Sequence, residues 1–294
     1  MTLQRGKTET GLVVEMRSIE IIIRMAIETP AKIAIIGAGP IGLEAALYAR
    51  FLGYETELFE RGSIAERFRN SNTNMPAPFR EISTPLALAA MEAQGDYEPP
   101  PEESVLTGGE FVDQYLAPLA KTDLIRGEIR TECEVVAVRR ADPSHHSMEE
   151  SNDENNDEER EEEGDAPTLS IQFRNADGTE DTASAHVVID ASGRDLSATT
   201  ADLSFFKELE IDFCKNTGTF LGVQTGFDVG REQLTEPVNL ISNEPNVYVL
   251  GSKSFGWGFD FTLRDGHEQI QGLFSILGDR ADLDLYRSIR PLGG

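Results

Sequence analysis

The sequence predicts an α/β fold, a doubly wound parallel sheet into which a small antiparallel meander is inserted. Three observations lead to this fold class. Residues 32–36 form a short apolar run, typical of a strand buried on both faces of a parallel sheet. A glycine-rich turn, a helical pattern and a second strand at 56–60 follow within about thirty residues. Farther along, strand patterns at 134–139 and 168–173 precede a third apolar run at 185–190, which predicts a meander that returns to the parallel sheet.

The first helix is bounded by two residues with opposite preferences. Pro40 suits the first turn of a helix, where its missing N–H is not needed, and Gly53 suits the end. Small and apolar residues recur between them, including Ala46, which permits close packing on the sheet. Because strand, helix and strand follow one another so closely, we expect a right-handed βαβ unit.

The remaining elements are less regular. Residues 71–101 are rich in Pro, Asn and Ser and are predicted to be mainly loop. After Gly193 the pattern weakens, and residues 213–236 are left unassigned. The other predicted elements are helices at 86–92, 110–119, 203–209 and 265–277, a turn at 175–178, and a strand at 247–250 closed by Gly251.

The chain is strongly acidic, with 52 Asp and Glu, 26 Lys and Arg and a net charge of −26. This charge opposes binding to nucleic acid and to anionic membranes. Residues 149–165 alone hold eleven acidic residues and one Arg. We expect 145–167 to be a disordered acidic insert in a hairpin loop, because a loop lengthens at little cost and self-repulsion keeps it solvated. Calcium or a basic partner is the alternative ligand, but the ligand spacing of an EF-hand is absent.

The two cysteines indicate the compartment. Cys133 and Cys214 form neither a CxxC pair nor a metal-ligand spacing, so the sequence predicts no disulfide framework and no metal site. A reducing, cytoplasmic location is expected. Charged residues interrupt the apolar clusters of residues 1–24 before they reach an export or membrane-spanning length. We expect that segment to be a disordered extension, with Met25 as an alternative start.

Three glycines after the first strand form a GxGxxG motif, and each has a different task. Gly37 permits the tight turn, and Gly39 lets the backbone approach a pyrophosphate without a Cβ in the way. Gly42 allows the helix to lie close to the strand. The helix start at Pro40 and Ile41 then offers unpaired N–H groups and the positive end of the helix dipole to phosphates.

Glu60 ends the second predicted strand, eighteen residues after Gly42. A carboxylate there can accept hydrogen bonds from both hydroxyls of an adenosine ribose and would repel a 2′-phosphate. The motif therefore predicts a Rossmann-type site that prefers FAD or NAD to NADP. The alternative is a glycine turn that serves packing alone.

Residues 32–60 resemble the first FAD motif of flavoproteins with two dinucleotide-binding domains, the family that includes thioredoxin reductases and flavin-containing monooxygenases. Residues 187–193, Val-Val-Ile-Asp-Ala-Ser-Gly, resemble the second FAD motif of that family. Residues 246–251 and 266–270 resemble its closing strand and helix, whose N-terminus faces the flavin. The resemblance implies a Rossmann-type FAD-binding domain and these cofactor-binding residues: Gly37, Ala38, Gly39, Pro40, Ile41, Gly42, Glu60, Val135, Ala191, Gly193 and Gly251.

The departures from the family pattern bear on the reaction. The family inserts an NAD(P)-binding domain with its own glycine motif, but only about fifty residues separate Gly193 from Val247 and they hold no such motif. Residues 201–209 are similar to the segment that follows that domain, so 194–200 would mark where most of it is missing. No aspartate follows Gly251, and without a CxxC pair a thioredoxin-reductase mechanism has no redox disulfide.

The resemblance implies an FAD-dependent oxidoreductase, monooxygenase-like, that passes electrons from NAD(P)H to oxygen or a small substrate. The alternatives are a flavin-binding module that depends on a redox partner and an NAD-binding domain of another dehydrogenase class. No catalytic acid or base can be named. Lys253 and His267 are candidates to lie near the flavin, but Lys253 is expected to be solvated and His267 to be a polar residue near a helix start. Phe255 and Trp257 are as suited to packing as to covering the flavin.

The sequence divides as follows: the extension, residues 1–24; the first part of the FAD-binding domain, 25–144; the acidic insert, 145–167; the meander and second motif, 168–193; an irregular connector, 194–245; and the closing strand and helix, 246–294.

Overall fold

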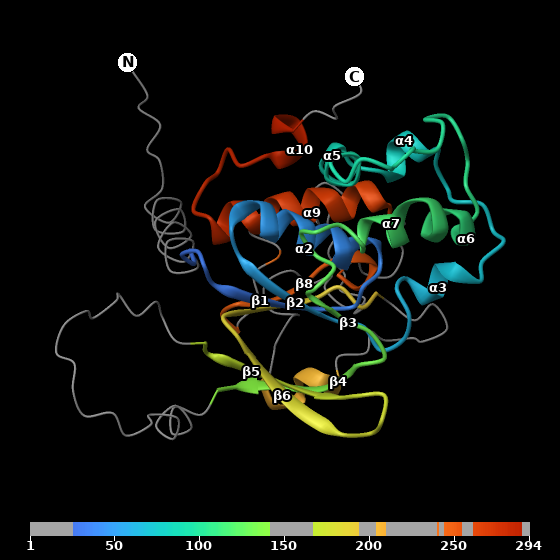
Figure 1. The fold of residues 1–294 in the computed structure, drawn as a ribbon. Helices are drawn as coiled ribbons and strands as arrows, with labels where there is room; N and C mark the ends of the chain where they lie inside the picture. The colour runs from blue at the N-terminus through green and yellow to red at the C-terminus, as the bar shows by residue number, and fades with distance from the viewer. Residues whose placement is uncertain are drawn as a thin grey trace, which may run out of the picture.

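The computed structural model describes residues 26–141, 167–193, 204–209, 240, 244–254 and 261–289. These residues form three layers (Figure 1). Helices cover one face of a five-stranded sheet, and a three-stranded antiparallel sheet lies against the other face. The predicted extension, most of the acidic insert and most of the connector lie outside the described residues, and the domain division stays a prediction.

All strands of the central sheet are parallel and stand in the order β3-β2-β1-β7-β8. The chain therefore leaves β1 toward one side and later returns on its other side, which makes the carboxyl ends of β1 and β7 a topological switch point. The predicted α/β fold class is confirmed. The strands are β1 (Lys32–Ile36), β2 (Glu55–Phe59), β3 (Ile129–Arg130), β7 (Val187–Asp190) and β8 (Val247–Val249).

Helices α2 (Pro40–Leu52) and α9 (Leu263–Leu277) pack side by side on the sheet. The rings of Tyr48 and Phe274 stack between them with centroids 5.1 Å apart. Helix α2 begins at Pro40 and ends at Gly53, whose φ of 93° is the left-handed conformation typical of a helix end. Helix α9 starts with a capping box, in which Thr262 and Asp265 each accept a hydrogen bond from the other's backbone N–H.

Shorter helices cover the same side of the sheet (Figure 1). The predicted helix at 110–119 is one continuous helical stretch with a π-helical turn at its centre. The predicted helix at 203–209 is a 3₁₀ turn. The elements on the helical side are α3 (Glu66–Arg69), α4 (Phe79–Ile82), α5 (Pro85–Glu92), α6 (Gly108–Phe111), η1 (Val112–Leu116), α7 (Ala117–Leu119) and α10 (Leu285–Ser288). The turn η7 (Gly251–Lys253) follows the last strand of the central sheet, and η3 (Ser204–Leu209) lies on the opposite side, in the apolar cluster below that sheet.

The antiparallel sheet is the predicted meander, made of β4 (Glu134–Arg140), β5 (Leu169–Arg174) and β6 (Glu180–Ala185). Its inner face packs through Val138 and Ile171 into an apolar cluster shared with the central sheet. One boundary differs from the prediction. The apolar run predicted as one strand at 185–190 begins with the last residue of β6 and continues through β7. The rest of β6 was not predicted.

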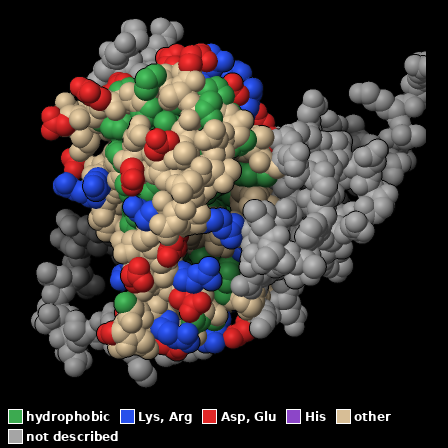
Figure 2. Space-filling model, turned by 90° about the vertical axis from the view of Figure 1, so that its right-hand side faces the viewer, with side chains coloured by type: hydrophobic (Ala, Val, Ile, Leu, Met, Phe, Trp, Pro, Cys, Tyr) green, Lys and Arg blue, Asp and Glu red, His purple; other side chains and the backbone are tan. Residues whose placement is uncertain are grey.

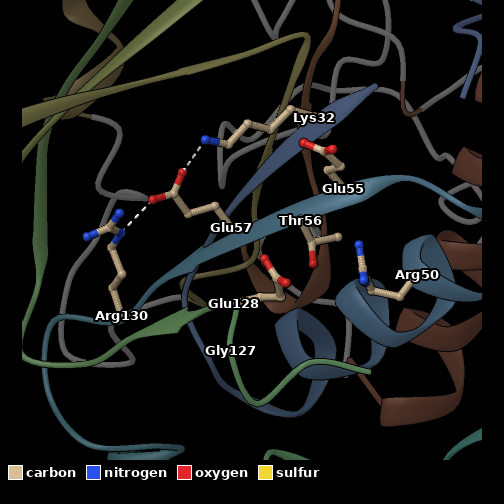
Figure 3. A pocket seen from close by; sticks show the side chains of 8 residues that line it. All are labelled: Lys32, Arg50, Glu55, Thr56, Glu57, Gly127, Glu128 and Arg130. Carbon is tan, nitrogen blue, oxygen red and sulfur yellow. Dashed lines mark hydrogen bonds and ion pairs between the residues drawn. The ribbon is translucent and has the colours of Figure 1, made fainter. Parts of the chain in front are cut away.

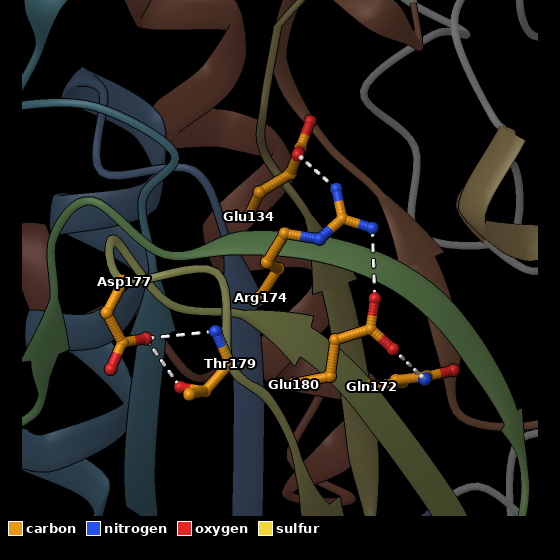
Figure 4. Close-up of polar contacts among 6 residues, drawn as sticks. All are labelled: Glu134, Gln172, Arg174, Asp177, Thr179 and Glu180. Carbon is orange, nitrogen blue, oxygen red and sulfur yellow. Dashed lines mark hydrogen bonds and ion pairs between the residues drawn. The ribbon is translucent and has the colours of Figure 1, made fainter.

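Polar contacts hold the exposed face of this sheet together (Figure 4). Arg174 lies 2.9 Å from Glu180 and 3.5 Å from Glu134, so it bridges three strands. Asp177 accepts hydrogen bonds from the backbone N–H and the hydroxyl of Thr179 in the turn between β5 and β6. Basic and acidic side chains are interspersed over the lower part of the face in Figure 2, and surface pairs of this kind contribute little stability one by one.

No helix within the described ranges is long and apolar enough to cross a membrane.

Candidate functional site

The glycine turn lies at the switch point of the sheet. Gly37 follows β1 with a φ of +101°, and its N–H donates to the carbonyl of Phe59. A Cβ on Gly37 would lie 2.7 Å from the Cα of Ser192, in the loop after β7. A Cβ on Gly42 would lie 1.8 Å from the Gly37 carbonyl oxygen. Both glycines are therefore required by the packing of the protein itself.

Gly39 is different, because a Cβ there would meet no atom of the described residues within 4 Å. Its φ of −80° is open to any residue, and it stands at the start of α2 without a side-chain cap. The first N–H groups of α2 thus have no capping side chain, and the space in front of Gly39 is one that a Cβ would fill. A diphosphate fits this combination of open space and helix N-terminus.

Glu60 lies directly beside the turn. Its Oε2 accepts the N–H of Ala38 at 2.8 Å, and its Oε1 accepts the N–H of Gly62 at 3.0 Å. Each carboxylate oxygen has two lone pairs, so Glu60 retains acceptor capacity for ribose hydroxyls after these two bonds. The side chain therefore ties the glycine turn to the end of β2 and is suited to bind an adenosine ribose next to it.

The loops after β7 and β8, which hold the two later motifs of the sequence, lie beside the glycine turn. Ala191 donates its N–H to the Ile36 carbonyl at the end of β1. Gly193 has a φ of +73°, and a Cβ on it would lie 3.9 Å from the hydroxyl of Ser252. Gly251 has a φ of +78° and faces Ile41 in the first turn of α2. Segments far apart in the sequence thus meet at the carboxyl ends of β1, β7 and β8, the place where open α/β sheets bind their ligands, and we refer to this place as the crevice.

Val135 is placed differently from the other predicted residues. It lies on β4 opposite Phe173 and is buried in the apolar cluster between the two sheets. Its segment contacts the site through backbone, where Cys133 donates its N–H to the Glu60 carbonyl. The structure brings the remaining predicted cofactor-binding residues together around the crevice.

Lys253 corrects an expectation from the sequence. It was predicted to be solvated, yet its side chain is only 2% exposed and its Nζ lies 2.8 Å from Oδ2 of Asp190, which is fully buried. Sequence reasoning missed the pair because its members stand 63 residues apart. The available signal was Asp190 itself, an acidic residue at the end of an otherwise apolar strand.

Two other titratable groups lie on α2 and α9. The ring of His267 lies 5.8 Å from that of Tyr286 on α10, and burial lowers the pKa of His267 to about 4. Glu44, on α2, is buried and accepts a hydrogen bond from the hydroxyl of Thr84 at 2.7 Å. Burial raises the pKa of Glu44 to about 7. Phe255 and Trp257 lie outside the described residues.

A separate cavity of about 560 Å³ lies at the other end of the sheet, beside the start of β2. Figure 3 shows Lys32 and Arg130 turned toward Glu57, and the ion pairs measure 2.6 and 2.5 Å. It is lined by three basic and three acidic side chains, of which Lys32 and Arg130 both pair with Glu57, while Arg50 donates to backbone carbonyl groups. The lining residues are Lys32, Arg50, Glu55, Thr56, Glu57, Gly127, Glu128 and Arg130.

Comparison with known proteins gives one family match and several distant structural ones. The family model of pyridine nucleotide-disulphide oxidoreductases matches residues 32–71. No curated protein sequence matches the chain.

The solved structures similar to this chain are distant. A bacillithiol disulfide reductase from Bacillus cereus is 16% identical over 55% of this chain and 40% of its own, with a TM-score of 0.39. An S-allyl-L-cysteine S-oxygenase from Allium sativum is 21% identical over 58% of this chain and 38% of its own, with a TM-score of 0.36. OTEMO in complex with FAD and NADP is 16% identical over 57% of this chain and 26% of its own, with a TM-score of 0.34.

This chain therefore spans 40% or less of the length of these three proteins. Over residues 32–71, which hold the glycine turn and Glu60, it matches the pyridine nucleotide-disulphide oxidoreductase family, as the resemblance of that segment predicted.

Proposed function

We propose that this chain binds FAD in the crevice between the glycine turn and the loops after β7 and β8. We propose further that it is an FAD-dependent oxidoreductase, monooxygenase-like, which passes electrons from NAD(P)H to oxygen or a small substrate. The open space at Gly39 is the observation that carries the proposal. A glycine that the packing of the described residues does not require, at an uncapped helix start, suits a backbone that must approach a ligand closely.

The residues of the crevice divide the work of binding. The first N–H groups of α2 would bind the diphosphate, with the positive end of the helix dipole beneath it. Glu60 would accept the ribose hydroxyls and disfavour a 2′-phosphate. The loops at Ala191–Gly193 and Gly251 would border the rest of the cofactor. FAD, when bound, supplies hydride and single-electron transfer, while the protein supplies position and electrostatic surroundings.

An absorption spectrum tests the proposal directly. The purified chain, or the chain titrated with FAD, is expected to show a bound-flavin spectrum that bleaches when NADPH or NADH is added without oxygen. Bleaching would support an oxidoreductase with its own reductant site. A chain that stays colourless and takes up no FAD would contradict the proposal.

Glu60→Ala tests the binding mode. Loss of the ribose hydrogen bonds is expected to weaken FAD binding by roughly 1 to 3 kcal/mol. Because Glu60 also holds the N–H groups of Ala38 and Gly62, the thermal midpoint of the unliganded variant must be measured beside the affinity. An FAD affinity equal to that of the wild type would remove Glu60 from the site.

A second candidate function is a flavin-binding module without its own NAD(P)H site, reduced by a redox partner. The single glycine motif in the sequence favours it. A flavin spectrum that NAD(P)H does not bleach, but dithionite does, would support this candidate. Uptake of NAD without FAD would instead indicate a dehydrogenase of another class.

A further inference from the structure

The ion pair of Lys253 and Asp190 is enclosed on all sides. The two side chains are 2% and 0% exposed, and Nζ and Oδ2 lie 2.8 Å apart. Nζ also stands 5.2 Å from the centre of the Phe205 ring. Charges buried to this extent are retained where each has a partner of opposite sign, because removing one partner leaves the other uncompensated.

Ser192 joins the pair into a closed triad. Its hydroxyl accepts a hydrogen bond from Lys253 Nζ at 2.6 Å and donates to Oδ1 of Asp190 at 2.7 Å. Its backbone N–H donates to the same Oδ1 at 3.0 Å. A serine nucleophile would need the lysine to accept its proton, but here the Ser192 hydroxyl donates its hydrogen bond to the Asp190 carboxylate and accepts one from Lys253. The triad is therefore suited to positioning and charge balance.

The triad stands at the crevice. Asp190 ends β7, and Lys253 lies in η7 after β8, so the pair joins the two loops that border the site. The Cα of Ser192 is the atom nearest to a Cβ built on Gly37, at 2.7 Å. In the same 3₁₀ turn as Lys253, Gly251 faces Ile41 at the start of α2. The triad thus contacts the same backbone that would bind a diphosphate, so the net charge of the triad affects that site.

We propose that Lys253 is a positioning residue that makes the crevice compatible with an anionic dinucleotide by cancelling the charge of Asp190. This inference rests on the proposed FAD binding. Glu60 already places one carboxylate at the glycine turn. Without Lys253, a second buried carboxylate would repel the diphosphate, and at low local dielectric such repulsion is only weakly screened.

The test is a double-mutant cycle read by FAD titration of the full chain, with flavin fluorescence as the signal. Lys253→Met is expected to weaken FAD binding at least tenfold. Adding Asp190→Asn to that variant removes the uncompensated charge and is expected to restore the affinity to within about threefold of the wild type. A role limited to bracing the loops predicts no such rescue, because the double variant lacks the ion pair as well.

Lys32→Met is the matched control, because it removes a lysine from another ion pair of the same sheet, with Glu57 at 2.6 Å. Lys32 lies at the amino end of β1, and the FAD affinity of Lys32→Met should equal that of the wild type. Circular dichroism melting of every variant reports folding. If Lys253→Met does not fold, Asp190→Asn alone carries the test, with an FAD affinity equal to or tighter than the wild type expected.

Each outcome has one meaning. Three results overturn the inference: unchanged FAD affinity in Lys253→Met, absence of rescue in the double variant, or a tenfold loss of affinity in Asp190→Asn. In each of these cases FAD binding by the wild-type chain leaves the proposed function intact. A wild-type chain that binds no FAD overturns the proposed function and this inference with it.

Discussion

Gly39 differs from Gly37 and Gly42 in the reason for which a glycine is needed. A Cβ there meets nothing within 4 Å in the part of the chain that the structure describes, whereas a Cβ on Gly37 or Gly42 meets backbone within 3 Å. Gly39→Ala should therefore change the unfolding free energy of the unliganded chain by less than about 1 kcal/mol, while it blocks the approach of a diphosphate and lowers FAD affinity at least tenfold. Urea unfolding and flavin titration measure the two effects.

The control is Gly37→Ala, which places a Cβ at a φ of +101° and against Ser192. It should destabilise the unliganded chain by more than about 1 kcal/mol. Equal FAD affinity in Gly39→Ala and the wild type would show that the open space does not receive the cofactor.

Glu44 makes stability depend on pH. Its pKa in the folded chain, about 7, lies above its ordinary value of 4.5, because burial disfavours the charged form. The folded state thus holds the proton more tightly, and its contribution to stability is complete below pH 4.5 and declines as the pH rises to 7. With about 1.4 kcal/mol for each pKa unit, this group alone accounts for a decline of roughly 3 kcal/mol.

Glu44→Gln keeps the acceptor for Thr84 and removes the titration. Its unfolding free energy, measured in urea at pH 5 and pH 8, should fall less between the two values than that of the wild type. Parallel pH profiles for the two chains would show that Glu44 does not titrate in this range.

The sequence predicted the position of a site residue where its partners are close to it along the chain. Gly37, Gly39, Gly42 and Glu60 lie within one βαβ unit, so their spacing alone predicted their arrangement. Lys253 and Asp190 are neighbours only because β7 and β8 pair in the folded sheet. The apolar pattern of each strand predicted the strand but not its partner.

Among the elements, α9 has a fixed connection to η7. Gln269 is fully buried, and its Oε1 accepts the N–H of Gly251 at 2.8 Å while its Nε2 donates to the hydroxyl of Ser254 at 2.6 Å. Gln269→Leu would leave the buried N–H of Gly251 without this acceptor. We expect a loss of about 1 to 3 kcal/mol in unfolding free energy.

The matched control is Gln271→Leu, two residues farther along the same helix and partly exposed. Its unfolding free energy should stay within about 0.5 kcal/mol of the wild type. Similar losses in the two variants would attribute the effect to the helix surface instead of the contact with η7.

Elements differ in how much of their structure the sequence predicts. Strands β1, β2 and β8 and helix α9 have strong apolar patterns, and they were predicted to within a few residues. Strand β6 was missed because most of its residues are polar and exposed on the outer edge of the small sheet. Strand β3 has only two residues and pairs solely with the end of β2, which is too short for any periodicity.

For the whole molecule, the hairpin of β4 and β5 is complete without the acidic insert. The ladder extends to Arg140 and Leu169, and Ala141 donates its N–H to the Thr168 carbonyl at 2.8 Å. Replacing residues 145–164 with a short Asn-Gly turn should leave FAD affinity unchanged and raise stability by about 0.5 to 1.5 kcal/mol, because the closed loop shortens. Urea unfolding and flavin titration check both values, and a loss in either would show that the insert contributes to the fold or the site.

The order of strands in the central sheet also has a consequence during biosynthesis. The glycine turn leaves the ribosome early, but the sheet neighbours that complete the crevice are β7 and β8, which begin at Val187 and Val247. At roughly 5 to 20 residues per second, synthesis of the chain from β1 to β8 takes on the order of 10 to 40 s. Until β7 has been synthesised, the edge of β1 that pairs with it has no partner strand, so the emerging polypeptide exposes an unpaired strand edge, and the proposed cofactor site is completed only after β8 has been translated.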